Sequence, residues 1–246
     1  MNYTVIIPTR YASTRLPGKP LQDIAGKPLL EHVYMSALQS NASEVIIATD
    51  DARIQSAAAA FGAQVCMTGA QHNSGTERLA EVARLNEYSN DHVIVNLQGD
   101  EYGMPAALLN QVAELLLNDT DAVMATVCEP IFSDEDFQNP NIVKVVRNAN
   151  EQALYFSRAP IAWHDSSPDN GVYGYRHIGL YAYRAGFLNH YVTLPACSAE
   201  QTERLEQLRA LHYGAVIAVA EAVAAPGLGI DTAADLERAR ELAGAD

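Results

Sequence analysis

Tyr3-Thr-Val-Ile-Ile7 is the stretch that decides the fold, a β-branched run that stops at Pro8. Such a run is typical of a short buried strand, because branched side chains fit a pleated sheet and proline cannot continue its ladder. A loop rich in Arg, Ser, Pro and Gly follows from Thr9 to Pro20, and apolar residues then recur at helical spacing between Leu29 and Ala37. The chain therefore opens with a strand, a loop and a helix.

The same alternation continues through the first hundred residues. Further strands are predicted over Glu44–Ala48, Ala63–Met67 and His92–Leu97, and helices over Ala52–Phe61 and Gly75–Leu85. Asp51 stands where the N-cap of a helix is expected. Strands that alternate with helices of about ten to fifteen residues indicate a parallel sheet with helices on both faces.

The pattern changes after about residue 120. Strands are predicted there with few helices between them, at Ala122–Val127, Val143–Val146, Leu154–Ser157 and His177–Tyr183. They favour an antiparallel or mixed extension of the sheet. A helix over Ala199–Tyr213, a strand over Val216–Val219 and a helix over Ala233–Leu242 complete the chain. We predict one domain over 1–246, an α/β fold whose Rossmann-like, mostly parallel sheet is flanked by helices, with a strand-rich, partly antiparallel insert at about 125–190.

Composition excludes several classes of function. The 246 residues, 48% of them hydrophobic, are enough to bury a sizeable core. The net charge of −14 repels duplex nucleic acid and anionic lipid, so neither is expected as a partner. No apolar run approaches the length of a membrane span and the first residues do not resemble a secretory signal, which predicts no membrane association. Cys66, Cys128 and Cys197 lie far apart, as expected of free thiols in the cytoplasm.

Cations are concentrated in the loop after the first strand. In open α/β sheets, ligands bind beyond the carboxyl ends of the strands, so this loop borders the expected site. Arg10, Arg15 and Lys19, with Gly18 allowing close approach of the backbone, have the chemistry needed to hold a triphosphate. A solvated loop whose arginines pair with the abundant acids has the same composition. The loop is neither a Walker A box nor a GxGxxG motif, so composition alone leaves both interpretations open.

Two aspartates have an equally open interpretation. Asp100 follows the predicted strand His92–Leu97, where a buried carboxylate requires a metal ion or cations, but it also fits a cap of the next turn. Asp231 lies just before the last predicted helix, and either Asp231 or Thr232 is suited to be its N-cap.

The order of residues in the first loop, R-x4-R-x-PGK-P, resembles the opening of the sugar nucleotidyltransferases, and among them the CMP-Kdo synthetase (3-deoxy-manno-octulosonate cytidylyltransferase) family. Eight further motifs in this order extend the resemblance over nearly the whole chain: Ala48-Thr-Asp-Asp51, Ser74-Gly-Thr-Glu-Arg78, Val95-Asn-Leu-Gln-Gly-Asp-Glu101, Asn139-Pro-Asn141, Ala153-Leu-Tyr-Phe-Ser-Arg158, Arg176-His-Ile-Gly179, Leu205-Glu-Gln-Leu-Arg209 and Gly229-Ile-Asp-Thr232.

The resemblance implies a reaction and a set of site residues. CTP and a 3-deoxy-ulosonic acid, Kdo, would give CMP-Kdo and pyrophosphate for lipopolysaccharide synthesis, with Mg²⁺ held by Asp100 and Asp231. Catalysis would rest on Lys19, Arg10 and Asp100, and the nucleotide would be bound by Arg10, Ser13, Arg15, Lys19, Gln71, Ser74 and Asp100. The sugar would be bound by Arg78, Gln98, Arg158, His177, Tyr181, Glu206 and Gln207. The family also implies a homodimer, and the insert at 125–190 is expected near the sugar site and the dimer contact.

The sugar residues differ in how the sequence places them. His177 and Tyr181 stand four apart on one predicted strand, so both side chains are expected on one face. Glu206 and Gln207 are expected on the predicted helix Ala199–Tyr213. Cytosine is expected to be selected by backbone groups of the first loop and of the segment 71–74.

The chain also departs from the family pattern. Tyr102-Gly-Met104 stands where a proline and a large aliphatic residue are usual, the loop Trp163–Tyr175 is short, and Thr9 replaces a more usual alanine. These changes leave the transfer chemistry intact and the sugar less certain. The alternatives are a cytidylyltransferase for 8-amino-Kdo or sialic acid, or a non-catalytic nucleotide-binding relative.

Overall fold

Parallel strands form the first half of the central sheet, as predicted. The computed structural model describes residues 2–13, 15–72, 74–166 and 168–244. Strands β1 (Tyr3–Pro8), β4 (Glu44–Thr49), β5 (Gln64–Met67) and β6 (Val93–Asn96) lie in the order β6-β1-β4-β5, and each neighbouring pair is parallel. Their carboxyl ends therefore meet at one edge of the sheet.

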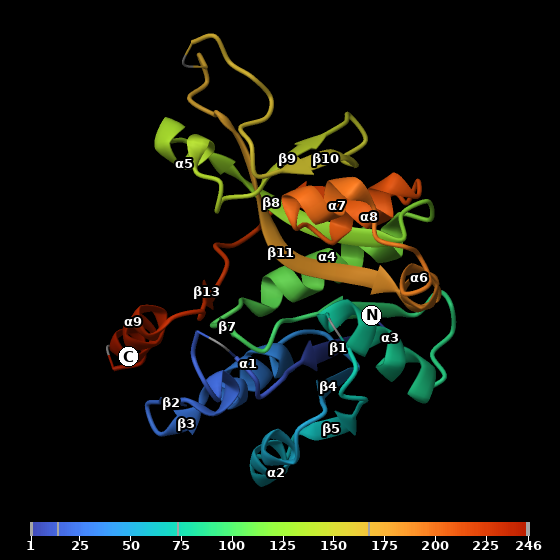
Figure 1. The fold of residues 1–246 in the computed structure, drawn as a ribbon, viewed down its shortest axis with the longest axis vertical. Coiled ribbons are helices and arrows are strands. Elements are labelled where there is room, and N and C mark those ends of the chain that lie inside the picture. Colours follow the sequence, from blue (N-terminus) through green and yellow to red (C-terminus); the bar gives the residue numbers. More distant parts are fainter. Residues whose placement is uncertain (1, 14, 73, 167, 245–246) are drawn as a thin grey trace.

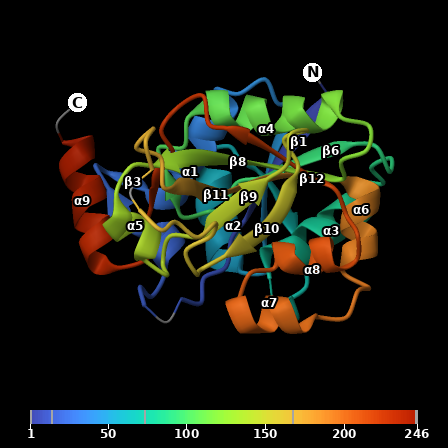
Figure 2. The ribbon, with the colours of Figure 1, turned by 90° about the horizontal axis from the view of Figure 1, so that it is seen from above.

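Helices cover both faces of these strands. They are α1 (Leu29–Leu38), α2 (Ala52–Ala60), α3 (Gly75–Leu85), α4 (Ala106–Asn118) and α6 (Ala185–Tyr191). Side chains alternate along β1, so Val5 and Ile7 join one buried cluster with α1 and α4 while Ile6 joins a second cluster with α3 and α6. Figure 2 shows α4 on one side of the sheet and α3 and α6 on the other. The arrangement is an α/β fold with two cores.

The second half of the chain extends the same sheet with antiparallel pairs. The added strands are β8 (Met124–Ile131), β9 (Lys144–Arg147), β10 (Ala153–Ser157), β11 (Gly174–Arg184) and β12 (Ile217–Glu221). Strand β11 is antiparallel to β6, β8 and β9, whereas β12 is parallel to β8. In Figure 1, β11 runs between the N-terminal strands and the hairpin of β9 and β10, and α5 (Asp134–Gln138) contacts β8. The predicted mixed extension is confirmed.

One helical prediction fails and one long helix was missed. The single helix expected over 199–213 is wrong, because the chain forms α7 (Ser198–Glu203) and α8 (Gln207–His212) with Arg204 in the left-handed region at φ 55°. The break follows from Glu203, whose carboxylate accepts hydrogen bonds from Ser157 Oγ and Arg158 N and so ties the end of α7 to β10. Helix α4 was not predicted, although Leu108, Leu109, Val112 and Leu116 form its buried stripe.

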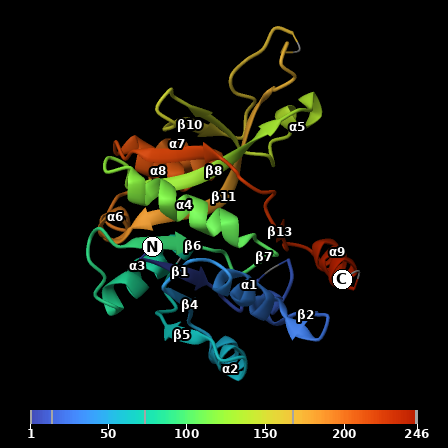
Figure 3. The ribbon, with the colours of Figure 1, turned by 180° about the vertical axis from the view of Figure 1, so that it is seen from behind.

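A small antiparallel ribbon joins two distant segments. Strands β7 (Glu101–Tyr102) and β13 (Leu228–Gly229) pair, and Ile230 N donates to Asp100 O at 2.9 Å. Helix α9 (Ala233–Ala243) follows, capped by Thr232 in a capping box with Asp235, so Asp231 is not the cap. Figure 3 shows α9 beside β2 (Asp23–Ile24), which pairs with β3 (Lys27–Pro28). The ribbon brings the segment that carries Asp231 next to Asp100.

No helix within the described residues has both the length and the apolar character needed to span a bilayer.

Candidate active site

A cleft with a volume of about 400 Å³ lies at the carboxyl ends of β1 and β6. Its walls come from five parts of the chain: the first loop, the start of α3 with the residues before it, the turn after β6, the residue before α8 (Gln207–His212) and the segment before α9. The predicted residues that line it are Arg10, Ser13, Arg15, Lys19, Ser74, Arg78, Gln98, Asp100, Glu206 and Asp231. Residues from both ends of the sequence thus meet where an open α/β sheet binds ligands.

Lys19 is the cation at the centre of this cleft. It begins the short helix η1 (Lys19–Leu21) directly after Gly18, whose φ of 64° is readily available only to glycine. The Nζ atom lies 2.5 Å from Asp100 Oδ2 and 3.1 Å from Asp231 Oδ1, and Arg15 Nη2 lies 2.9 Å from the same Asp231 oxygen. Asp100 and Asp231 therefore face one another across Lys19. The Lys19 side chain is largely buried, with 14% of its surface exposed.

A third carboxyl group adds to the negative charge here. Glu101 follows Asp100 on β7, and its pKa is raised to about 7, first by burial and then by the charges of Asp100 and Asp231. Within 2–13, 15–72, 74–166 and 168–244, no group of three or more His, Cys, Asp or Glu is placed to hold a metal ion by itself. The donors are hard carboxylate oxygens, two of which face the cleft, so phosphate oxygens and water would have to complete the shell of a divalent cation. That is the usual way in which Mg²⁺ is bound.

The nucleotide residues differ in how the structure places them. Ser74 is the N-cap of α3, accepting a hydrogen bond from Glu77 N at 3.3 Å, so the positive end of this helix opens on the cleft. Ser13 Oγ accepts from Leu16 N at 3.4 Å and helps to shape the first loop. Gln71 packs against Gly69 and, among the described residues, is not part of the cleft wall. Asn73 lies outside the described residues, so cytosine selection by the segment 71–74 stays a prediction.

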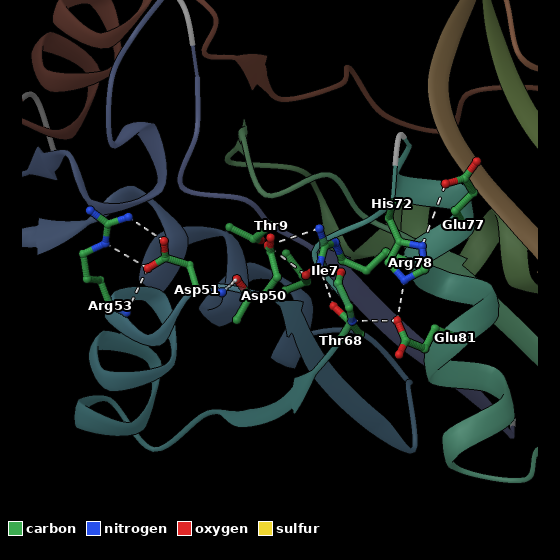
Figure 4. A network of polar contacts seen from close by, with 12 residues as sticks. Ile7, Thr9, Asp50, Asp51, Arg53, Thr68, His72, Glu77, Arg78 and Glu81 are labelled. Atoms are coloured by element: carbon green, nitrogen blue, oxygen red, sulfur yellow. Dashed lines mark hydrogen bonds and ion pairs between the residues drawn. The ribbon is translucent and has the colours of Figure 1, made fainter.

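Arg78 is held in the wall of the cleft by a polar network (Figure 4). Its guanidinium contacts Thr68 Oγ1 through Nη1, and Nη2 lies 3.2 Å from Asp50 Oδ1. His72, which also lines the cleft, contacts the Glu81 carboxylate through Nε2. His72 is not among the site residues predicted from the sequence. The available signal was its place just before the motif that begins at Ser74.

A second hollow of about 250 Å³ adjoins the cleft and shares Gly75, Gln98 and Glu206 with it. His177, Tyr181 and Gln207 line this hollow, so it gathers most of the predicted sugar residues. The His177 and Tyr181 rings lie 5.2 Å apart on one face of β11, as predicted. Between Ile178 and Tyr181, strand β11 has two residues more than the facing part of β8. Because side chains alternate with a period of two, this irregularity leaves His177 and Tyr181 on the same face of β11.

The second hollow contains mostly neutral groups. Burial lowers the pKa of His177 to about 3, so its ring is neutral near pH 7, and Nε2 lies 3.1 Å from Thr126 Oγ1. Although part of Glu206 reaches solvent, the surrounding protein raises the pKa of its carboxyl, which accepts from Thr76 Oγ1 at 3.0 Å. Arg204 contributes a positive charge to the lining and was not selected from the sequence, because the helix break that exposes it was not foreseen.

Arg158 is not brought to either hollow. Its Nε donates to Glu203 O at 2.8 Å and its Nη1 to Pro140 O at 3.0 Å. The guanidinium thus closes the contact between the end of β10 and α7. The structure does not support the expected contact of Arg158 with a sugar carboxylate within this chain's own cleft.

Comparisons with known proteins agree with this geometry. A family model described as cytidylyltransferase matches residues 4–218. The 3-deoxy-manno-octulosonate cytidylyltransferase of Cellvibrio japonicus is 55% identical, covering 98% of this chain and 98% of that protein. The enzyme of the same name from Vibrio vulnificus strain CMCP6 is 53% identical with the same two coverages.

Solved structures give the same result. CMP:2-keto-3-deoxy-manno-octonic acid synthetase complexed with CTP superimposes with a TM-score of 0.91 and 43% identity, covering 99% of this chain and 98% of the other. A 4-diphosphocytidyl-2C-methyl-D-erythritol synthase, at 14% identity and a TM-score of 0.65, shares the fold. The chain belongs to the cytidylyltransferases and, among them, to the 3-deoxy-manno-octulosonate cytidylyltransferase family.

Proposed function

We propose that this chain transfers the cytidylyl group of CTP to 3-deoxy-D-manno-octulosonate (Kdo), giving CMP-Kdo and pyrophosphate for lipopolysaccharide synthesis. The observation that carries the proposal is the meeting of Lys19 with Asp100 and Asp231 in one cleft of a family member. A cation between two acids, beside a loop with two further arginines, suits a polyanionic substrate and a bound metal ion.

The reaction is a direct displacement at the α-phosphorus. The anomeric hydroxyl of Kdo forms the new oxygen–phosphorus bond as the bond from phosphorus to the pyrophosphate oxygen breaks, and the hydroxyl proton is lost to solvent or to a nearby carboxylate. Negative charge builds on the pyrophosphate that leaves. Arg10, Arg15 and Lys19 line the cleft where the triphosphate would lie, so their charges would favour this transition state without a covalent intermediate.

Asp100 and Asp231 would hold Mg²⁺ in this proposal. Two carboxylates that face the same cleft, with a third acid beside them, offer hard oxygen donors that fit a divalent cation. The ion would neutralise charge at the transferred phosphate and lower the pKa of the attacking hydroxyl. Lys19 now contacts both acids, so it would have to share them with the cation or turn toward the phosphates.

The second hollow would receive the sugar. Gln98 and Glu206, which line both spaces, would contact the sugar next to the α-phosphate. His177, neutral because of its burial, would exchange hydrogen bonds with hydroxyl groups rather than pair with the sugar carboxylate. That carboxylate requires a cation. Besides Arg10, Arg15 and Lys19, which are assigned to the triphosphate, Arg78 lines the cleft and Arg204 lines the second hollow.

The departures from the family pattern have structural partners. Tyr102 belongs to the ribbon and its ring contacts His32, while Met104 is buried and its carbonyl accepts a hydrogen bond from Ser36 Oγ. These residues therefore support the site without lining either space. Thr9 does line the cleft, so support for unmodified Kdo over 8-amino-Kdo or sialic acid comes from the full-length relatives named for 3-deoxy-manno-octulosonate.

The test is pyrophosphate release from CTP and Mg²⁺ with Kdo, 8-amino-Kdo and N-acetylneuraminate supplied separately. Release is expected with Kdo, and UTP in place of CTP serves as the control for base selection. Release with none of the three sugars would contradict the enzymatic proposal and favour a nucleotide-binding relative. Release with N-acetylneuraminate alone would contradict the choice of Kdo.

We further propose a homodimer in the cytoplasm, where CTP is available and free thiols such as Cys66, Cys128 and Cys197 persist. Support comes from large apolar side chains exposed in the insert at 125–190, namely Phe132, Leu154, Tyr155 and Trp163. Light scattering of the wild type against Trp163→Ser would test the contact. A monomeric wild type would contradict it.

A further inference from the structure

The Ala48-Thr-Asp-Asp51 motif is not explained by the reaction, since neither of its aspartates lines the cleft in the part of the chain that the structure describes. Asp51 ends the segment after β4 and is the N-cap of α2, accepting from Arg53 N at 2.9 Å. The same carboxylate accepts two hydrogen bonds from the Arg53 side chain, from Nε at 3.0 Å and from Nη2 at 2.6 Å (Figure 4). This two-point contact fixes the plane of the guanidinium.

The fixed guanidinium lies over the ring of Tyr11, with its central carbon 3.4 Å from the ring centroid. Tyr11 belongs to the first loop and stands between Arg10 and Ala12, which line the cleft. Tyr11 itself turns the other way, toward α2. A stack of this kind is an attractive cation–π contact, and here its cation cannot easily rotate out of place.

The hydroxyl end of the Tyr11 ring contacts the turn that carries Lys19. A methyl group at Gly18 would lie 3.1 Å from the Tyr11 hydroxyl and 3.2 Å from the adjacent ring carbon, so ring and backbone are in close contact. Gly18 directly precedes Lys19, and its carbonyl accepts from Leu21 N at 2.9 Å to close η1. The contacts therefore run from Asp51 through Arg53 and Tyr11 to Gly18 and so to Lys19.

We propose that Arg53 is a positioning residue for the cytidylyl transfer, which holds the first loop in its triphosphate-binding form by stacking on Tyr11. Asp51 orients Arg53, and neither residue touches the substrate. The inference rests on the proposed function only where its test measures enzyme kinetics. Asp51 stays ionised at neutral pH, because hydrogen bonds from Arg53 lower its pKa to about 2.

The central experiment compares Arg53→Ala with the wild type. The KM for CTP is expected to rise about three- to tenfold while kcat falls by less than about twofold, because the variant must order the loop when CTP binds. Trypsin should cleave the variant faster after Arg10 or Arg15, and CTP should restore protection. The melting temperature is expected to stay within about 2 °C, since Arg53 is exposed. Arg238→Ala, which removes an exposed arginine from α9, is the matched control.

Further variants test each contact between Asp51, Arg53 and Tyr11 separately. Arg53→Lys keeps a cation above Tyr11 but loses the two-point contact, so an intermediate KM is expected. Tyr11→Leu should reproduce Arg53→Ala, and the double variant should be no worse than either single one, because both remove the same contact. Asp51→Asn keeps a good N-cap and should still loosen the loop.

Two outcomes would overturn the inference. One is an Arg53→Ala protein with wild-type KM for CTP and wild-type cleavage of the loop. The other is a variant that loses several degrees of melting temperature with the loop still protected, which would assign Arg53 a purely structural role. If the wild type released no pyrophosphate, the proposed function would fail while cleavage of the loop would still test the contact.

Discussion

Lys19 and Asp100 are joined across the floor of the cleft by a contact of 2.5 Å between Nζ and Oδ2. Lys19 is placed by a turn that depends on Gly18, and Asp100 by the turn after β6. Asp231 joins them because the β7–β13 ribbon holds its segment against Asp100. Next to them, burial and then the charges of Asp100 and Asp231 raise the pKa of Glu101 to about 7.

Replacing Asp100 with asparagine tests this arrangement directly. Asp100→Asn is expected to lower kcat by at least about 10²- to 10³-fold, because the charge that holds the cation of the reaction is lost. The free energy of unfolding should change by less than about 1 kcal/mol, because loss of the ion pair with Lys19 is offset by relief of the repulsion from Glu101 and Asp231. Pyrophosphate release and urea unfolding are the measurements. Asp91→Asn, at an exposed position, is the control, and near-normal turnover of Asp100→Asn would show that the metal is held elsewhere.

Removing Lys19 is expected to separate metal binding from catalysis. Without this cation, Asp100 and Asp231 lose the partner that they share, and only Asp231 keeps an ion pair, with Arg15. Lys19→Met should therefore bind Mn²⁺ about tenfold more tightly in the absence of CTP. Its turnover should nevertheless be lost. Titration calorimetry with Mn²⁺ measures the affinity, with Lys27→Met as a control outside the cleft. Equal or weaker Mn²⁺ binding would argue against a metal site at these two acids.

The sequence predicted the fold where local pattern and burial agree. The run from Tyr3 to Ile7 is buried along its whole length, and the helix over 75–85 has the bounds expected from its apolar spacing. The break between α7 and α8 was not predictable in this way. It depends on hydrogen bonds from Ser157 and Arg158 to Glu203, and periodicity within one segment carries no information about such distant partners.

The same limit applies to the site. Motif order was enough to select Lys19, Asp100 and Asp231, and the structure brings them together. Motif order does not show the direction in which a side chain points. Arg158 therefore carried the expectation of a ligand although it bonds to main-chain carbonyls, and the cleft-facing position of His72 was missed.

Thr9 and Gly99 are expected to depend on one another. A methyl group at Gly99 would lie 2.4 Å from Thr9 Oγ1 and 3.3 Å from Pro8 O, so Gly99→Ala should lower the free energy of unfolding by about 1–3 kcal/mol. Thr9→Ala removes the closer atom, and the double variant should regain most of the loss. Urea unfolding of the four proteins gives the coupling. Gly179→Ala, where the added methyl group meets nothing within 4 Å, is the control. Simple additivity of Thr9→Ala and Gly99→Ala would contradict the steric argument.

His177 is expected to make the protein sensitive to mild acid. Burial lowers its pKa to about 3 in the folded chain, against about 6.5 when unfolded, so the unfolded state binds more protons between these values. Stability from the neutral ring is therefore fully present above pH 6.5 and is lost as the pH falls. At pH 5 the loss amounts to about 2 kcal/mol relative to pH 8. Other acids titrate alike in both proteins, so the comparison of wild type with His177→Asn isolates this contribution.

The measurement is the free energy of unfolding in urea at intervals from pH 8 to pH 5. His177→Asn loses the contact with Thr126 and should be less stable than the wild type at pH 8, but the difference should shrink by about 2 kcal/mol at pH 5. His190→Asn, at an exposed position, should follow the wild-type curve throughout. If the curves of wild type and His177→Asn run parallel over this range, the ring is not buried in its neutral form, and its proposed role as an uncharged partner of the sugar hydroxyls fails with it.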